Sequence, residues 1–113
     1  MQPDPNPDLC LVLTTVSDLE VARRLAKDWV ERGLVACVNL LPGLESHYSW
    51  EGQLEASPEV LLLLKTPRAR LADVRAAVAS DHPYDVPEFV VLEATEVSAA
   101  YAAWARAATG QGS

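Results

Sequence analysis

The polar segment from His82 to Glu88 holds the side chains best suited to chemistry. Its sequence, HPYDVPE, places a proline on each side of Tyr84, which stiffens the backbone. The acidic neighbours of His82 are Asp81, Asp85 and Glu88. An imidazole and carboxylate oxygens are ligands for divalent cations. The same residues also fit a rigid connection that carries solvated acidic groups and a histidine near a helix end, and the residues alone favour this second interpretation.

Two aromatic residues and a lysine form a second candidate site. Tyr48 and Trp50 fall near the tip of an expected hairpin, where they either line a ligand pocket or pack against a neighbouring subunit. Lys65 ends an apolar run, so its charge needs a carboxylate partner or access to solvent. We expect Lys65 to pair with Glu88 at a subunit boundary, and Glu59 is the alternative partner.

The first half of the chain predicts a strand, a helix and a long hairpin. Residues 9–16 are apolar and rich in β-formers, and Ser17 with Glu20 has the spacing of a capping box at a helix start. Gly33 is suited to end that helix. The strand over 34–41 continues to position 50 if Pro42-Gly43 forms a bulge, and the next strand runs from the turn at 51–53 to Thr66.

The second half predicts two helices with a strand between them. Thr66 and Pro67 fit the cap and first position of a helix that runs to about Ser80. A fourth strand follows over 89–97, and Ser98 caps a last helix. The order βαββαβ predicts an α+β, ferredoxin-like sandwich: an antiparallel sheet with both main helices on one face. The other face is largely bare, so we expect a homo-oligomer.

Length and composition bound the domain organisation. The chain has 113 residues, half of them hydrophobic, which suffices for one domain. We expect the domain to span residues 9–108, between a disordered, proline-rich tail over 1–8 and a flexible tail over 109–113.

Several classes of function are disfavoured by the residue inventory. Nine Lys and Arg against sixteen Asp and Glu disfavour nucleic acid as a partner. The chain lacks an apolar run long enough to span a membrane, and its N-terminus does not resemble an export signal, so we expect a cytoplasmic protein without a membrane partner. The glycines within the folded part are isolated, which argues against phosphate-binding loops. Cys10 and Cys37 are expected to be reduced.

Four motifs in order resemble the CutA family of divalent-cation tolerance proteins. They are ACVNLLPG over 36–43, S-x-Y-x-W-E-G over 46–52, EV at 59–60 with LKT at 64–66, and HPYDVPE over 82–88. The likeness spans residues 9–108. It implies a trimer of ferredoxin-like subunits, similar in architecture to PII signal proteins, that is linked to tolerance of copper and other divalent metals and is not an enzyme.

The resemblance also implies two sets of site residues. In a copper-binding member, a cysteine and two histidines supply ligands at the positions of Thr14, Asp81 and His82, so Cu²⁺ binding here is expected to be weak. A PII-like sensor is the alternative, with a ligand held in clefts between subunits; a trimer that only scaffolds partners is a third. The pocket residues expected for the sensor are Trp50, Lys65, Tyr84 and Glu88, with Glu59 and Cys37.

Overall fold

The structure is a computed structural model that describes residues 1–111. Its elements are β1 (Leu9–Val16), α1 (Leu19–Glu31), β2 (Cys37–Trp50), β3 (Gln53–Pro67), the 3-10 turn η1 (Arg68–Arg70), α2 (Leu71–Asp81), β4 (Val90–Glu93) and α3 (Ala99–Ala108). This order matches the expected βαββαβ arrangement with one additional C-terminal helix.

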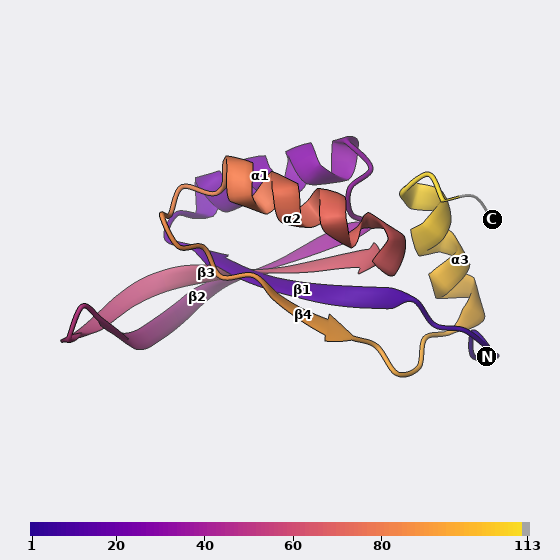
Figure 1. Ribbon diagram of the computed structural model, residues 1–113, viewed down its shortest axis with the longest axis horizontal. Coiled ribbons are helices and arrows are strands. Elements are labelled where there is room, and N and C mark those ends of the chain that lie inside the picture. The colour runs from indigo at the N-terminus through magenta and orange to yellow at the C-terminus, as the bar shows by residue number, and fades with distance from the viewer. Residues whose placement is uncertain (112–113) are drawn as a thin grey trace.

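The four strands form one antiparallel sheet in the order β2-β3-β1-β4. Figure 1 shows α1 and α2 on the same face of this sheet and α3 beyond one end of it. The β2-β3 hairpin extends past the other end as an arm. The expected ferredoxin-like sandwich, with an extra helix, is therefore confirmed.

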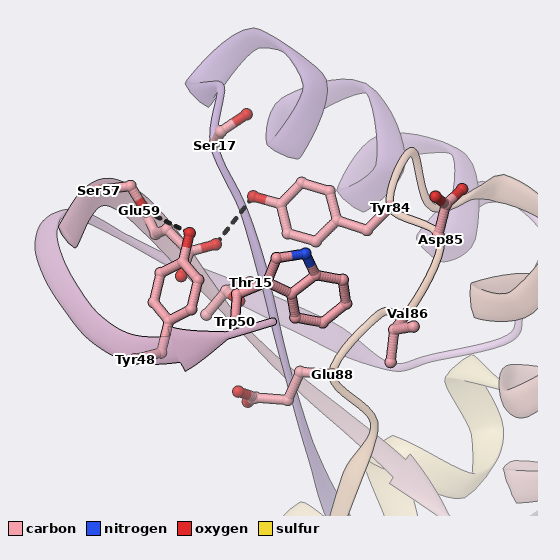
Figure 2. A pocket seen from close by; sticks show the side chains of 10 residues that line it. All are labelled: Thr15, Ser17, Tyr48, Trp50, Ser57, Glu59, Tyr84, Asp85, Val86 and Glu88. Atoms are coloured by element: carbon pink, nitrogen blue, oxygen red, sulfur yellow. Dashed lines mark hydrogen bonds between the residues drawn. The ribbon is translucent and has the colours of Figure 1, made fainter. Parts of the chain in front are cut away.

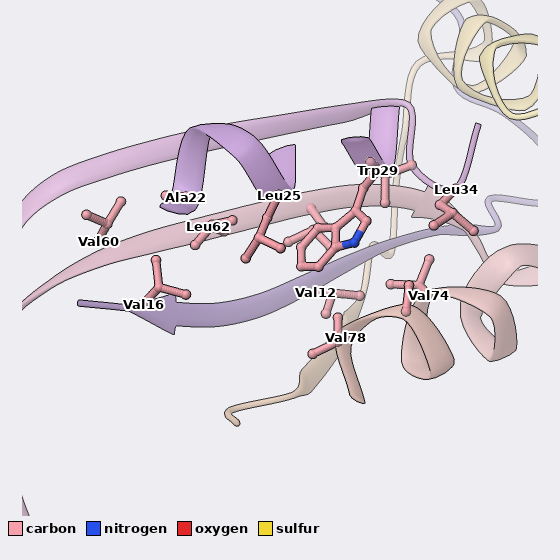
Figure 3. Packing of buried hydrophobic residues seen from close by; sticks show 13 residues of the cluster. Val12, Val16, Ala22, Leu25, Trp29, Leu34, Val60, Leu62, Val74 and Val78 are labelled. Atoms are coloured by element: carbon pink, nitrogen blue, oxygen red, sulfur yellow. The ribbon is translucent and has the colours of Figure 1, made fainter. Parts of the chain in front are cut away.

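The core lies between the sheet and the two main helices. Strand alternation turns Val12 and Val16 of β1 and Leu62 and Leu64 of β3 toward the helices, and all four side chains are buried. Trp29 of α1 is also buried among them, as Figure 3 shows. This packing holds the end of β1 and the start of α1 in fixed positions beside the arm.

A β-bulge at Pro42-Gly43 reverses the sheet face to which the following side chains of β2 point. Leu41 pairs with Leu61, but Leu44 pairs with Glu59, so β2 contains one extra residue. Gly43 adopts a φ of 83°, which a residue without Cβ accepts at little cost. The extra residue reverses the alternation, and Tyr48 and Trp50 therefore share a face with Glu59. The predicted continuation of one strand through Pro42-Gly43 is confirmed.

Several element ends differ from the sequence predictions. Asp18, rather than Ser17, caps α1, because its carboxylate accepts the backbone N–H of Glu20 at 2.7 Å. Thr66 does not cap a helix: β1 pairs with β3 as far as Pro67, and the Thr66 hydroxyl donates to the carbonyl of Leu34 at 2.8 Å.

The fourth strand is shorter than predicted, ending at Glu93 instead of 97. It pairs only with residues 10–13 of β1, and the chain then turns toward α3. Ser98 caps α3 as predicted, because its hydroxyl accepts the backbone N–H of Tyr101.

The first eight residues are ordered, although their composition predicted a disordered tail. The backbone N–H of Asp4 donates to Val97, and that of Ala99 donates to Gln2. The Arg106 guanidinium lies 3.0 Å from the carboxylates of both Asp4 and Asp8. These bonds replace the apolar contacts that the segment lacks.

The expected flexible tail over 109–113 is also partly ordered. Thr109 is fully buried, and its hydroxyl donates to the carbonyl of Ala105 at 2.9 Å. Its own carbonyl accepts a bond from the Arg70 guanidinium, which explains the order. Residues 112–113 of that tail lie outside the described residues.

Candidate functional site

A cavity of about 510 Å³ lies at the base of the arm, on the sheet face opposite the helices. Three segments build it: the end of β1, the β2-β3 arm, and the connection between α2 and β4 (Figure 2). Its lining residues are Thr15, Ser17, Tyr48, Trp50, Ser57, Glu59, Tyr84, Asp85, Val86 and Glu88. The volume falls within the usual range for small-molecule sites.

A hydrogen bond between Tyr84 and Glu59 ties the connection to the arm. The Tyr84 hydroxyl donates to the Glu59 carboxylate at 2.8 Å. Burial, together with this bond to a carboxylate, raises the pKa of Tyr84 to about 12. The phenol is therefore a hydrogen-bond donor at neutral pH, and it holds the Glu59 carboxylate at the wall of the cavity.

His82 holds the same connection against β1. One ring nitrogen, Nδ1, accepts the backbone N–H of Tyr84 at 3.1 Å, so the proton is on Nε2, which donates to the carbonyl of Thr15 at 2.8 Å. The side chain is buried. Both nitrogens are thus engaged in the folded chain.

Asp81 is the last residue of α2 and bonds to residues at the end of α1. Its carboxylate accepts bonds from the Trp29 indole at 2.9 Å and from Arg32 at 3.2 Å. The bond from Trp29, with help from Arg32, lowers the pKa of Asp81. The residue therefore fastens α2 to α1.

Thr14 points into the core. It lies two residues from both Val12 and Val16, on the same face of β1, and is fully buried. The Thr14 hydroxyl has no hydrogen-bond partner within the described residues, and metal binding by Thr14, Asp81 and His82 remains a prediction. Among residues 1–111, no group of three or more His, Cys, Asp and Glu side chains is placed to hold a metal ion.

Four of the six pocket residues predicted from the sequence do meet. Trp50, Glu59, Tyr84 and Glu88 all line the cavity. The other two, Lys65 and Cys37, do not line it.

Lys65 and Cys37 pair with each other across β2 and β3, near the end of the sheet that α3 occupies. The Lys65 ammonium lies 5.9 Å from the centre of the Tyr101 ring. Within one described chain, Lys65 forms an ion pair with neither Glu88 nor Glu59, and the expected pair across a subunit boundary remains a prediction.

The remaining lining residues were missed for two reasons. Thr15 and Ser17 carry no motif that marks them as site residues. Asp85 was considered only as a possible cation ligand, and Val86 lies in the same motif, HPYDVPE, without a polar group. Ser57 could have been found, because it lies two positions from Glu59 on the same strand and so shares its face. Tyr48 was considered with Trp50, and the bulge explains why both reach the cavity.

None of the described helices is long and apolar enough to cross a membrane. α1 and α2 cover one face of the sheet, and α3 lies beyond one end of it.

A family model described as CutA1 divalent ion tolerance protein matches residues 10–108, nearly the whole chain. The chain belongs to the CutA1 family. The divalent-cation tolerance protein CutA of Thermus thermophilus is 45% identical over 100 residues, which cover 88% of this chain and 97% of that protein. The corresponding protein of Pectobacterium atrosepticum is 38% identical over 107 residues, covering 95% and 97%.

Solved structures of the CutA1 family agree with this assignment. CutA from Synechococcus elongatus superposes with a TM-score of 0.91 at 37% identity, covering 96% of each chain. The structure of the Thermus thermophilus protein gives a TM-score of 0.86 at 44% identity, covering 90% of this chain and 99% of that one. The resemblance inferred from four motifs therefore extends over the whole fold.

Proposed function

We propose that this chain acts in tolerance of copper and other divalent cations, as a non-enzymatic homotrimer in the cytoplasm. Its membership of the CutA1 family over residues 10–108 carries the proposal, because relatives that match it over nearly their full length are named for divalent-cation tolerance.

The test is growth under metal stress. Deleting the gene from its host should lower the copper concentration that arrests growth, and restoring the chain should reverse the effect. Equal growth of both strains across copper, zinc and cobalt would contradict the proposal.

The bare face of the sheet supports a homotrimer. Leu41, Val90 and Leu92 remain 43%, 44% and 48% exposed in the single chain, beside the half-buried Leu13 and Leu63 of the central strands. Apolar side chains gathered on one face are normally covered by a partner. A second copy of the chain has the same exposed face and the same arm.

We further propose that the chain binds Cu²⁺ weakly, with His82 as the anchoring ligand from the predicted set of His82, Asp81 and Thr14. An imidazole nitrogen binds a metal only when it is free of other partners. His82 must therefore release either Thr15 or Tyr84 to bind an ion, and this cost makes the affinity low.

The chain offers a matched control, since its only other histidine is the exposed His47. His82→Ala should weaken Cu²⁺ binding by about tenfold or more in calorimetric titration, whereas His47→Ala should leave it unchanged. Unfolding of the metal-free His82→Ala variant, measured in parallel, shows whether the variant still folds. Unchanged affinity in a folded His82→Ala variant would remove His82 as the ligand.

A further inference from the structure

Residues 1–8 form an N-terminal strap that lies beside the start of α3 (Figure 1). Its backbone pairs with the residues around that helix start. The N–H of Asp4 donates to the carbonyl of Val97 at 2.8 Å, and the N–H of Ala99 donates to the carbonyl of Gln2 at 2.8 Å. None of the side chains of the strap is buried. Hydrogen bonds and charge therefore hold the strap, without a buried apolar side chain.

Arg106 of α3 is the centre of the charged contacts. One nitrogen of its guanidinium, Nη1, lies 3.0 Å from a carboxylate oxygen of Asp4 and 3.0 Å from one of Asp8. The strap turns between these two residues, because the backbone N–H of Asn6 donates to the Asp4 carboxylate at 3.1 Å. The Asp4 side chain is only 8% exposed, so its charge requires a partner such as this guanidinium. Two aspartates four residues apart thus converge on one arginine.

Opening of the strap would leave three groups of the protein without partners. Segments with few buried apolar contacts open at a low cost in free energy, while the rest of the fold stays intact. The ion pairs of residues 1–111 join Arg106 only to Asp4 and Asp8, so opening removes both of its carboxylates. It also frees the carbonyl of Val97 and the N–H of Ala99. A peptide with two carboxylates and an accessible backbone satisfies all three groups.

The strap of a second copy is a poor candidate for this peptide. A swapped strap makes the same bonds that it makes in its own chain, so the exchange adds no contact. A strap tethered to its own chain also has an effective concentration of about 1 mM or more, which a separate copy does not reach in dilute solution. An acidic segment of a different protein has no site of its own to leave, and it gains the full set of bonds.

We propose that Arg106, Val97 and Ala99 form a docking site for an acidic segment of a partner protein, and that the strap closes this site in the free chain. The segment is expected to turn, and to carry two carboxylates four residues apart, as the strap does. The inference goes beyond divalent-cation tolerance and does not depend on it.

A peptide with the sequence of residues 1–8 is the probe. Its amino end carries the fluorophore, because Met1 is fully exposed. The double variant Asp4→Asn/Asp8→Asn weakens the strap and leaves the docking site unaltered. In fluorescence anisotropy, this variant should bind the peptide at least about tenfold more tightly than the wild type, in which the intact strap competes. Equal affinity of the two proteins, or no binding to the double variant at up to about 1 mM peptide, would overturn the proposal.

Two matched comparisons test the role of charge. A peptide with asparagine in place of both aspartates should bind the double variant about tenfold more weakly. Adding Arg106→Gln to the double variant should abolish binding, whereas adding Arg24→Gln, on the exposed side of α1, should leave it unchanged. Circular dichroism checks that each variant is folded. The peptide comparison needs no change in α3, so it decides the question even if Arg106→Gln does not fold. Equal binding of the two peptides would refute the site, as would binding to a folded variant with Arg106→Gln.

Sedimentation velocity distinguishes a partner protein from a second copy. With the strap closed, the wild type should form no particle larger than a trimer as its concentration rises. Larger particles that form in the wild type but not in Arg106→Gln would show that straps bind between copies, and the assignment to a different protein would fail.

Discussion

At the scale of single residues, His82 and Tyr84 build the wall of the cavity through paired hydrogen bonds. His82 links the backbone of Tyr84 to that of Thr15, and Tyr84 then reaches Glu59 on the arm. Two residues close in sequence thus join β1, the α2-β4 connection and β3. The motif HPYDVPE is explained by this structural task, whether or not a ligand is present.

The Tyr84–Glu59 bond predicts a dependence of stability on alkaline pH. The pKa of Tyr84 is about 12 in the folded chain and about 10 when unfolded. The unfolded chain therefore loses this proton first, so the contribution of Tyr84 is complete below about pH 10 and is lost as pH rises toward about 12. Tyr84→Phe should be about 1 kcal/mol less stable than the wild type near pH 8, and this gap should shrink between those values.

Urea unfolding of both proteins at several pH values measures the gap. Tyr101→Phe is the control for loss of a tyrosine hydroxyl, because no hydrogen bond of that hydroxyl is found within the described residues. A gap between wild type and Tyr84→Phe that stays constant from pH 8 to pH 12 would contradict the raised pKa.

Single residues also show what the sequence alone could predict about the site. Trp50, Glu59, Tyr84 and Glu88 line one cavity of the single chain, and the family motifs mark all four. Lys65 and Cys37 lie away from this cavity in the single chain, at the other end of β2 and β3, and their place in a cleft between subunits remains a prediction. Position along a strand depends on pairing register, which motif spacing does not specify.

At the scale of elements, the bulge in β2 decides the composition of the cavity. Without the extra residue at Pro42-Gly43, the alternation of β2 would turn Tyr48 and Trp50 to the helix-covered side of the sheet. The arm would then present other side chains to Glu59 and Tyr84. A local backbone irregularity is thus coupled to the chemistry of the site.

Gly43 should be sensitive to any side chain for conformational reasons alone. Its φ is 83°, and a Cβ added there would meet no atom within 4 Å. Gly43→Ala should therefore destabilise the fold by about 1 kcal/mol through backbone strain, and Gly43→Asn by less, because asparagine adopts this conformation more readily. Urea unfolding midpoints measure both. Equal stability of all three proteins would indicate that the bulge relaxes without cost.

The ends of elements were the least predictable part of the fold. The capping pattern at Ser17 was offset by one residue because Asp18 supplies a better-placed acceptor. Composition predicted disorder for residues 1–8, since it could not reveal that Arg106, about a hundred residues later, binds Asp4 and Asp8. Long, patterned segments such as 9–16 were predicted correctly because burial on one face enforces their periodicity.

The bonds to Arg106 predict that the N-terminal segment detaches in acid. The backbone N–H of Asn6, followed by the Arg106 guanidinium, lowers the pKa of Asp4. A lowered pKa stabilises the folded form at neutral pH, and this contribution is lost as pH falls through the pKa of the folded state. We expect the amides of Asp4 and Ala99 to lose protection below about pH 4.

Hydrogen exchange measures this attachment directly. Arg106→Gln should speed exchange at Asp4 and Ala99 about tenfold at neutral pH while leaving the core strands protected. Arg24→Gln on the exposed side of α1 removes the same charge as a control and should change neither amide. Unaltered protection in Arg106→Gln would mean that the backbone bonds alone hold the segment.

At the scale of the whole molecule, the helices of the single chain cover only one face of its sheet. Its dimensions are 47 × 25 × 23 Å, because the arm extends well beyond the helices (Figure 1). One sheet face is buried under α1 and α2, whereas the other presents leucines and valines to solvent. The cavity opens on this second face, so assembly and ligand access are linked.

Assembly should therefore fail when a charge is placed on the bare face. Leu41 on that face and Val30 on α1 are 43% and 41% exposed in the single chain, which makes them a matched pair. In a trimer that covers the bare face, Leu41→Asp buries a carboxylate in the interface, whereas Val30→Asp leaves it in water, because the outer side of α1 lies away from that face. Sedimentation velocity should find trimers for the wild type and Val30→Asp and monomers for Leu41→Asp. A wild-type monomer, or a trimeric Leu41→Asp, would show that this face is not the interface.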